Sequence, residues 1–175
     1  MPVRFGFIHE KIDIKILILF ILRRLPEPIT LEVLADLTLC DDGISYFDFA
    51  ECVSELVTTE HLKLEDGKYS LTKKGIRNGD ITQGSIPYTV RIKAEKSAAA
   101  LRAEQTRNAM IKTSHAERRE GGFKVALALS DGVGDIAAIE LFAASEQQAH
   151  DLENGFRKNA EQIYSDLIKI ILGEK

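Results

Sequence analysis

A short β-hairpin predicted between residues 62 and 75 constrains the fold of this chain more than any other segment. Its two arms, residues 62–65 and 68–71, alternate apolar and polar side chains around Asp66-Gly67. That dipeptide between two alternating segments is a strong signal for a two-residue hairpin turn. The fold must therefore place a pair of antiparallel strands directly after the segment that precedes residue 62.

Three helical patterns precede the hairpin. Residues 13–25 are almost wholly apolar and predict a buried central helix, ended by the Pro-Glu-Pro that follows. Thr30 is a suitable N-cap for a second helix over residues 31–39, and Ser45 for a third over residues 46–59. Helices followed by a hairpin are the plan of a winged helix-turn-helix, in which one helix enters a DNA groove. The alternative is an ordinary surface hairpin in a small α+β domain.

The third helix would be the DNA-recognition helix, but its charge argues against base recognition. The apolar residues that recur at helical spacing and predict its buried face are Phe49, Ala50, Val53, Leu56 and Val57. The opposite face has three acids and no Arg or Lys, although base edges are usually contacted by Arg, Lys, Asn or Gln. The residues expected nearest the bases at this helix are Ser45, Tyr46, Asp48, Cys52 and Glu55.

Basic side chains on and beyond the hairpin favour DNA binding. They are Lys63, Lys68, Lys73, Lys74 and Arg77. Because phosphate contacts dominate the affinity for DNA, we expect these side chains to contact the backbone. The alternative is that they only keep an exposed hairpin edge soluble.

Charge is distributed unevenly along the chain. Residues 1–84 carry 10 Lys and Arg against 14 Asp and Glu, whereas residues 85–120 carry 8 against 4. The acidic first segment argues against tight nonspecific DNA binding. Residues 85–120 form a basic segment. If this segment lies beside the hairpin, it supplies further phosphate contacts. If it lies elsewhere, a role in protein–protein contact gains support. Its basic residues include Arg91, Lys93, Lys96, Arg102 and Arg107.

A second domain is expected after the hairpin. The Gly-containing residues 78–85 predict a linker, so that residues 1–80 form one domain and residues 85–175 another. A helix begins near Pro87, and residues 102–119 are ambiguous between helix and strand.

Two further strands and a helix complete the second domain. Residues 123–129 and 136–143 predict strands around a Gly-containing turn. Ser145 caps a final helix of roughly 28 residues. A long amphipathic helix on a small sheet leaves surface for a partner, so a homodimer is expected.

No catalytic constellation, cofactor or metal site is expected. The histidines are far apart in the sequence and have no Cys or acid at ligand spacing; they are His9, His61, His115 and His150. Cys40 and Cys52 have no metal spacing and predict reduced, buried thiols in a cytoplasmic protein. The apolar residues 14–22 are too short to span a bilayer, which needs about 20 residues. Because no catalytic constellation, cofactor or metal site is expected, the chain is not expected to be an enzyme. The weaker alternative is an enzyme with a small-molecule pocket in the C-terminal region.

The order of these features resembles a family of small, uncharacterised proteins from low-GC Gram-positive bacteria, numbered four-three-six-four among the domains of unknown function. The likeness covers nearly the whole chain. It includes the apolar residues 14–22, Tyr46-Phe47, the hairpin ending Tyr69-Ser70-Leu71-Thr72-Lys73-Lys74-Gly75, Ile86-Pro87, and Ile163-Tyr164. The resemblance implies an N-terminal winged helix, a C-terminal α/β region and a presumed role in transcription regulation. It also implies a strand within residues 102–119, which would complete a three-stranded antiparallel meander.

Together these observations predict an α+β protein. An N-terminal winged helix-turn-helix is followed by a helix, a three-stranded antiparallel sheet and a long C-terminal helix. The expected function is that of a dimeric, cytoplasmic DNA-binding transcriptional regulator without a membrane segment. The alternative is a winged helix used for protein–protein contact, and the sequence indicates no particular small-molecule effector.

Overall fold

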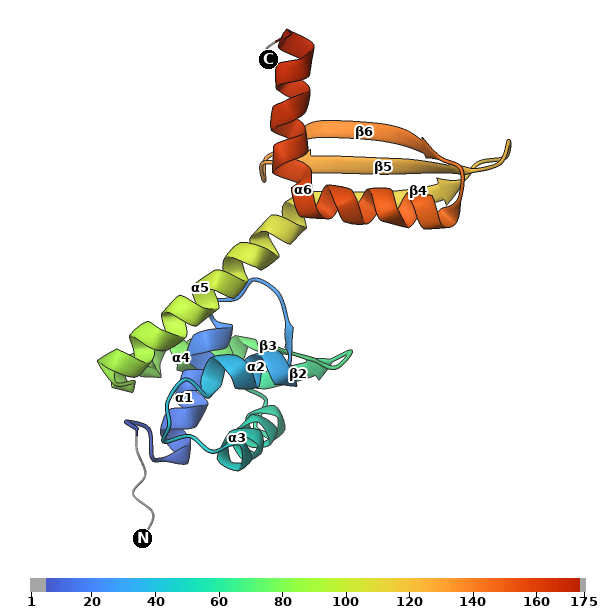
Figure 1. The fold of residues 1–175 in the computed structure, drawn as a ribbon. Helices are drawn as coiled ribbons and strands as arrows, with labels where there is room; N and C mark the ends of the chain where they lie inside the picture. The colour runs from blue at the N-terminus through green and yellow to red at the C-terminus, as the bar shows by residue number, and fades with distance from the viewer. Residues whose placement is uncertain (1–5, 174–175) are drawn as a thin grey trace. The chain divides into compact units, whose positions relative to one another are not determined.

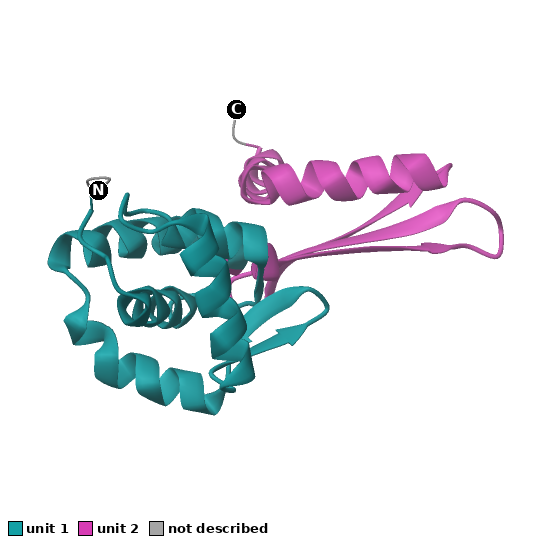
Figure 2. Ribbon diagram, turned by 90° about the horizontal axis from the view of Figure 1, so that it is seen from below, with its two compact units in different colours: residues 1–105 teal, residues 106–175 magenta. Residues whose placement is uncertain are grey.

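The computed structural model of the chain describes residues 6–173. These residues form two compact units, of which the first ends at Gln105 and the second begins at Thr106 (Figure 2). Each unit combines helices with a three-stranded antiparallel sheet. The α+β class expected from the sequence is therefore confirmed.

The first unit is built around α1 (Lys11–Leu22), which is buried on nearly every side. Leu17, Ile18 and Ile21 have no exposed surface. A helix that is apolar all round is stable only when neighbours cover all its faces. Here α2 (Leu31–Thr38), α3 (Tyr46–Thr58) and α4 (Lys73–Thr82) all contact α1 (Figure 1).

The predicted N-caps of α2 and α3 are both present. The Thr30 hydroxyl accepts a hydrogen bond from the Val33 N–H at 3.4 Å, and the Ser45 hydroxyl accepts one from the Asp48 N–H at 3.0 Å. Each hydroxyl satisfies an N–H that has no carbonyl partner in the first helical turn. The local sequence thus fixes where each helix begins.

The predicted hairpin consists of β2 (Leu62–Glu65) and β3 (Lys68–Leu71). Asp66 and Gly67 both have positive φ, 50° and 74°, as a type I′ turn requires. The two-residue strand β1 (Ile29–Thr30) pairs with the other edge of β3, so the sheet order is β1-β3-β2.

Residues 78–85 are not the linker expected from the sequence. They continue α4 and then form a single 3₁₀ turn, Gln83–Ser85. This helix contains two glycines, and at both of them another element approaches closely. A Cβ at position 75 would lie 2.1 Å from the His61 carbonyl oxygen, and one at position 79 would lie 3.3 Å from the Leu19 Cβ. The backbone of α4 therefore lies close to α1 and to the start of β2.

The domain boundary also differs from the expected one. The helix α5 (Tyr88–Met110) contributes Val90 and Ala94 to the core of the first unit, and Leu101 packs against that core. Residues 85–105 thus belong to the first unit, because their apolar side chains complete its core. The ambiguous residues 102–119 contain both structures: α5 continues to Met110, and β4 (Ile111–Glu117) follows directly.

The second unit is the expected antiparallel meander with a helix on one face. The strands β4, β5 (Phe123–Ser130) and β6 (Asp135–Ala143) are neighbours in that order. The helix α6 (Glu146–Leu172), capped by Ser145, packs on the sheet (Figure 1). The core between helix and sheet includes Val125, Leu127, Ala149, Phe156 and Ala160.

The helix α6 bends at Asn159, whose φ and ψ of −128° and 20° are not helical. The side-chain amide of Asn159 donates to the Gly155 carbonyl at 3.0 Å. Beyond this kink the helix carries exposed apolar side chains, namely Ile168, Ile170, Ile171 and Leu172.

Candidate functional site

The outward face of α3 differs from the one expected from the sequence. Cys52 was predicted to lie near DNA bases, but it has no exposed surface, and its thiol faces the Lys11 carbonyl at 3.5 Å. Phe49, Cys52, Val53 and Leu56 are the buried residues of this helix. The buried stripe is therefore rotated by a fraction of a turn from the expected one, and the exposed side chains include Phe47, Ser54 and Thr58.

Two of the three acids on α3 are paired with lysines of α1. Glu51 lies 2.6 Å from the Lys11 ammonium, and Glu55 forms an ion pair with Lys15. The Lys15 hydrogen bond and charge hold the pKa of Glu55 below its ordinary value. Each of these two carboxylates therefore has a compensating positive charge beside it, and the pair does not present an uncompensated acidic surface.

The other expected contacts of α3 lie at its N-terminus. Ser45 and Asp48 engage each other: the Ser45 hydroxyl donates to the Asp48 carboxylate at 2.7 Å while accepting from the Asp48 N–H. Tyr46 is 57% exposed and Phe47 is 78% exposed. Two exposed aromatic side chains at the start of one helix form a surface that protein partners commonly use.

Three of the predicted phosphate-contacting lysines line one open hollow of about 400 Å³, which we name the lysine hollow. Its lining residues are Glu60, Leu62, Lys63, Thr72, Lys73 and Lys74. The hollow lies at the N-terminus of α4, where the free N–H groups add positive potential. Lys74 also donates to the Thr59 carbonyl at the end of α3, at 2.8 Å, and Lys63 pairs with Glu65 at 2.8 Å.

Thr72 joins the start of α4 to the segment before β2, and both border the lysine hollow. Its hydroxyl accepts from the Gly75 N–H at 3.1 Å, which caps α4, and donates to the Glu60 carbonyl at 2.7 Å. The Thr-x-x-Gly ending of the hairpin thus has a physical reason: the threonine begins α4, and the glycine permits its close approach to His61. Lys68 and Arg77, the remaining predicted contacts, are exposed on β3 and α4.

The described contacts of α5 are made with the end of α1, with the loop that follows α1 and with α6. Glu95 of α5 pairs with Arg24 at 3.4 Å, and the Gln105 side chain bonds the Glu27 backbone. Arg91 lies over the Tyr88 ring, and Arg107 bonds residues of α6. Among the described residues, no ion pair or hydrogen bond joins α5 to β2 or β3.

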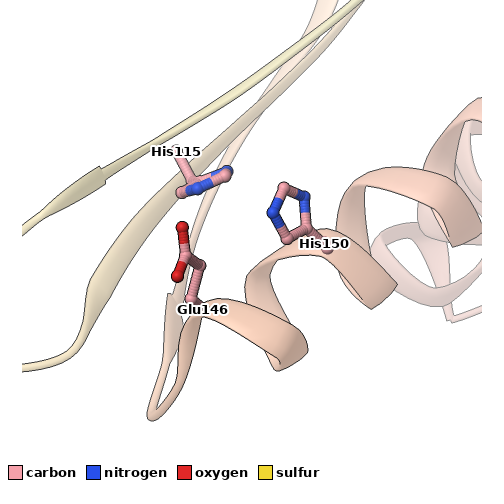
Figure 3. Close-up of side chains that lie close together, drawn as sticks. All are labelled: His115, Glu146 and His150. Carbon is pink, nitrogen blue, oxygen red and sulfur yellow. The ribbon is translucent and has the colours of Figure 1, made fainter.

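The second unit brings together four side chains that the sequence reasoning did not connect. The imidazoles of His115 on β4 and His150 on α6 lie 4.7 Å apart between ring centroids. Glu146 and Glu153 of α6 lie beside them, and Figure 3 shows His115, Glu146 and His150 pointing toward one another. We name these four residues the histidine cluster.

The expectation that no acid stands at ligand spacing from a histidine was therefore wrong for His150. Glu146 precedes it by four residues and Glu153 follows it by three, and both spacings place side chains on the same face of a helix. This signal was present in the sequence. The contribution of His115 could not be found in that way, because it depends on how α6 packs across β4.

The cysteines are free, as expected. Cys40 is half-buried and Cys52 is buried. Burial raises the pKa of Cys52 to about 11 and also raises the pKa of Cys40. Both thiols therefore stay protonated near neutral pH, which makes them poor nucleophiles.

Comparison with known proteins shows which family the chain belongs to. Over residues 6–173, no helix combines the length and hydropathy needed to cross a bilayer. No curated protein and no solved structure matches the chain. Residues 14–171 match the family described as domain of unknown function DUF4364. This match spans nearly the whole sequence and includes both units, so the chain belongs to the DUF4364 family.

Proposed function

We propose that the protein is a DNA-binding transcriptional regulator whose first unit, a winged helix, contacts the phosphate backbone through the lysine hollow. The observation that carries this proposal is the convergence of Lys63, Lys73 and Lys74 on one open hollow at the start of α4. Lysine ammonium groups and helix N-termini are both common phosphate contacts in protein–DNA complexes. Lys68 at the hairpin end and Arg77 on α4 extend the basic surface.

The corrected face of α3 supports this role better than the face expected from the sequence. Glu51 and Glu55 are neutralised by α1, so their repulsion of phosphate is reduced. The exposed Ser54 hydroxyl can donate to phosphates or base edges, whereas the Thr58 hydroxyl already donates to the Ser54 carbonyl at 3.0 Å. Since α3 lacks an exposed Arg for bidentate base contact, we expect most of the affinity to come from the backbone.

The regulator would act as a homodimer in the cytoplasm, where its DNA is found. The exposed apolar residues beyond the kink of α6 support the dimer, because a run of large apolar side chains is uncommon on a monomeric surface. A two-fold dimer would present two copies of the first unit to successive half-sites.

Titration of labelled duplex DNA from the protein's own upstream region, at two salt concentrations, tests the proposal. The test variant is Lys73→Glu/Lys74→Glu. The matched control is Lys93→Glu/Lys96→Glu, which makes the same change in net charge at exposed positions of α5. Circular dichroism melting establishes that each variant is folded.

The expected result is binding that weakens steeply with salt and is lost in Lys73→Glu/Lys74→Glu but retained in the control. Each phosphate contact contributes about 0.9 to the steepness of the slope of log K against log salt, so the two lysines account for about 2 of the wild-type slope. Equal loss in both variants would mean that net charge alone matters. Absence of binding to this region and to genomic fragments, even at low salt, would overturn the proposal.

The second candidate function is protein–protein contact through the first unit. The exposed pair Tyr46 and Phe47 favours it, because aromatic side chains are enriched at interface hot spots. This candidate predicts no DNA binding by any variant. It also predicts a protein partner that binds the wild type but does not bind the variant Tyr46→Ser/Phe47→Ser.

A further inference from the structure

We propose that the histidine cluster of the second unit is a binding site for a divalent first-row transition metal ion, with zinc as its simplest occupant. His115, Glu146 and His150 would supply the ligands, and Glu153 would orient the two imidazoles. The site belongs entirely to the second unit, so the proposal is independent of whether the first unit binds DNA.

The positions of the three ligand residues carry the proposal. One potential ligand atom from each of His115, Glu146 and His150 lies within 4.8 Å of the other two. Atoms that bind zinc at about 2.0–2.1 Å in a tetrahedron are about 3.3 Å from one another. Small side-chain rotations therefore suffice to close the site, and the exposed Glu146 and His150 are able to make them.

Two structural elements fix the geometry. The helical spacing of Glu146 and His150 places them one turn apart on α6. His115 lies on β4, where it pairs with Val125 of β5. Its side chain is on the same face of the strand as that of the half-buried Thr113, two residues earlier. The Phe123 ring meets the His115 ring at 5.8 Å in an edge-to-face arrangement, which limits rotation of the imidazole.

Glu153 occupies the position of an orienting carboxylate. Its side chain is 14% exposed, and its oxygens lie 3.3 Å from Nδ1 of His115 and 3.7 Å from Nδ1 of His150. Histidine ligands of metals usually donate the other ring N–H to such a carboxylate, which raises the basicity of the ligating nitrogen. With Glu153 on the Nδ1 side, Nε2 of each ring is the atom assigned to the metal.

The donor set selects the class of metal. Two imidazoles and a carboxylate suit zinc and its neighbours in the first transition row, whereas magnesium and calcium prefer sites made of oxygen atoms. The N-terminus of α6 disfavours a cation, and the carboxylates of Glu146 and Glu153 offset this effect. His150 is half-exposed, so a fourth position remains open to water, as in zinc sites with three protein ligands.

Zinc binding by the untagged full-length chain, after treatment with a chelator, tests the proposal. Competition with a chromophoric chelator gives the affinity and the number of zinc ions per chain. The test variants are His150→Ala, His115→Ala and Glu153→Gln. The matched control is His9→Ala, which removes an exposed histidine that lies outside the cluster. Cobalt added in place of zinc reports on the ligands through its visible absorption.

The expected result is one zinc ion per chain, bound by the wild type and by His9→Ala. Affinity should fall at least tenfold in His150→Ala and His115→Ala, and about 10- to 100-fold in Glu153→Gln. The cobalt spectrum should lack thiolate charge-transfer absorption, because neither cysteine takes part. Zinc, but not magnesium, should raise the melting temperature of the wild type and leave that of His150→Ala unchanged.

Three results would overturn the proposal: no zinc binding by the wild type, equal affinity in His150→Ala, or a thiolate signature with cobalt. If His115→Ala fails to fold, His150→Ala decides the matter, because its side chain is 51% exposed and its loss leaves the core intact.

Discussion

Arg107, near the end of α5, bonds both carboxylate oxygens of Glu161 on α6, at 2.7 and 2.8 Å. The same guanidinium donates to the carbonyls of Arg157 and Lys158, at 2.9 and 3.3 Å. These carbonyls directly precede the kink at Asn159, where the regular helical hydrogen bonds are interrupted. Arg107 therefore stabilises the bend of α6 rather than serving as the phosphate contact that its place in a basic segment suggested.

This pair predicts a pH dependence of stability. The Arg107 hydrogen bonds hold the pKa of Glu161 below its ordinary value of 4.5. The stabilisation is thus complete above pH 4.5 and disappears as the pH falls through the lower folded-state pKa. We expect Glu161→Gln to be less stable than the wild type at pH 7, with the difference vanishing in acid. Urea unfolding at pH 7 and pH 3.5 measures this difference in the free energy of unfolding. The control is Asp166→Asn, on the same half of α6. A difference that grows in acid would contradict this assignment.

Glycines in two helices should respond oppositely to alanine. At position 75 a Cβ would lie 2.1 Å from the His61 carbonyl, so Gly75→Ala should destabilise the first unit by about 1–3 kcal/mol or more. At position 155 a Cβ meets nothing within 4 Å, so Gly155→Ala should stabilise α6 by about 0.5–1 kcal/mol. Chemical denaturation gives both values. Equal destabilisation by the two substitutions would contradict the idea that Gly75 is required for the close approach of the His61 carbonyl.

The exposed end of α6 predicts the oligomeric state. Ile170 and Ile171 are 72% and 77% exposed, and a homodimer would bury them. We expect sedimentation at micromolar concentration to show a dimer for the wild type and a monomer for Ile171→Asp. Asn154→Asp adds the same charge to an exposed position of α6 and should leave the dimer intact. A monomeric wild type would exclude this end of α6 as a dimer interface.

The cysteines should differ in their reaction with iodoacetamide. Cys52 is buried with a pKa of about 11, whereas Cys40 is only half-buried. Because the thiolate is the reactive form, Cys40 should be alkylated first and Cys52 only on unfolding. Mass spectrometry of peptides after timed labelling separates the two sites. Equal labelling rates in the folded protein would place Cys52 on the surface and contradict its burial in the first unit.

Local chemistry explains which features could be predicted from the sequence. The caps Thr30, Ser45 and Ser145 and the turn at Asp66-Gly67 depend on a few neighbouring residues, and all are present in the structure. The meander of β4, β5 and β6 follows from alternation and from the turn residues.

The features that were missed depend on contacts between distant segments. The helix α4 includes two glycines, Gly75 and Gly79, whose missing side chains allow the close approach of His61 and Leu19. Cys52 is buried because neighbouring elements cover that side of α3, which apolar spacing alone does not specify. The histidine cluster requires α6 to lie across β4 at one particular register.

The course of α5 sets where the chain can be divided. Because Val90 and Ala94 complete the first core, a fragment ending at residue 80 would expose the apolar surface that they cover, and we expect it to aggregate. A fragment ending at Gln105 keeps them. The linker predicted from Gly79 and Gly84 thus lies inside a folding unit. Insertions tolerated in ordinary linkers would be expected to disrupt folding there, so any exchange of the second unit for another would have to be made within a helix.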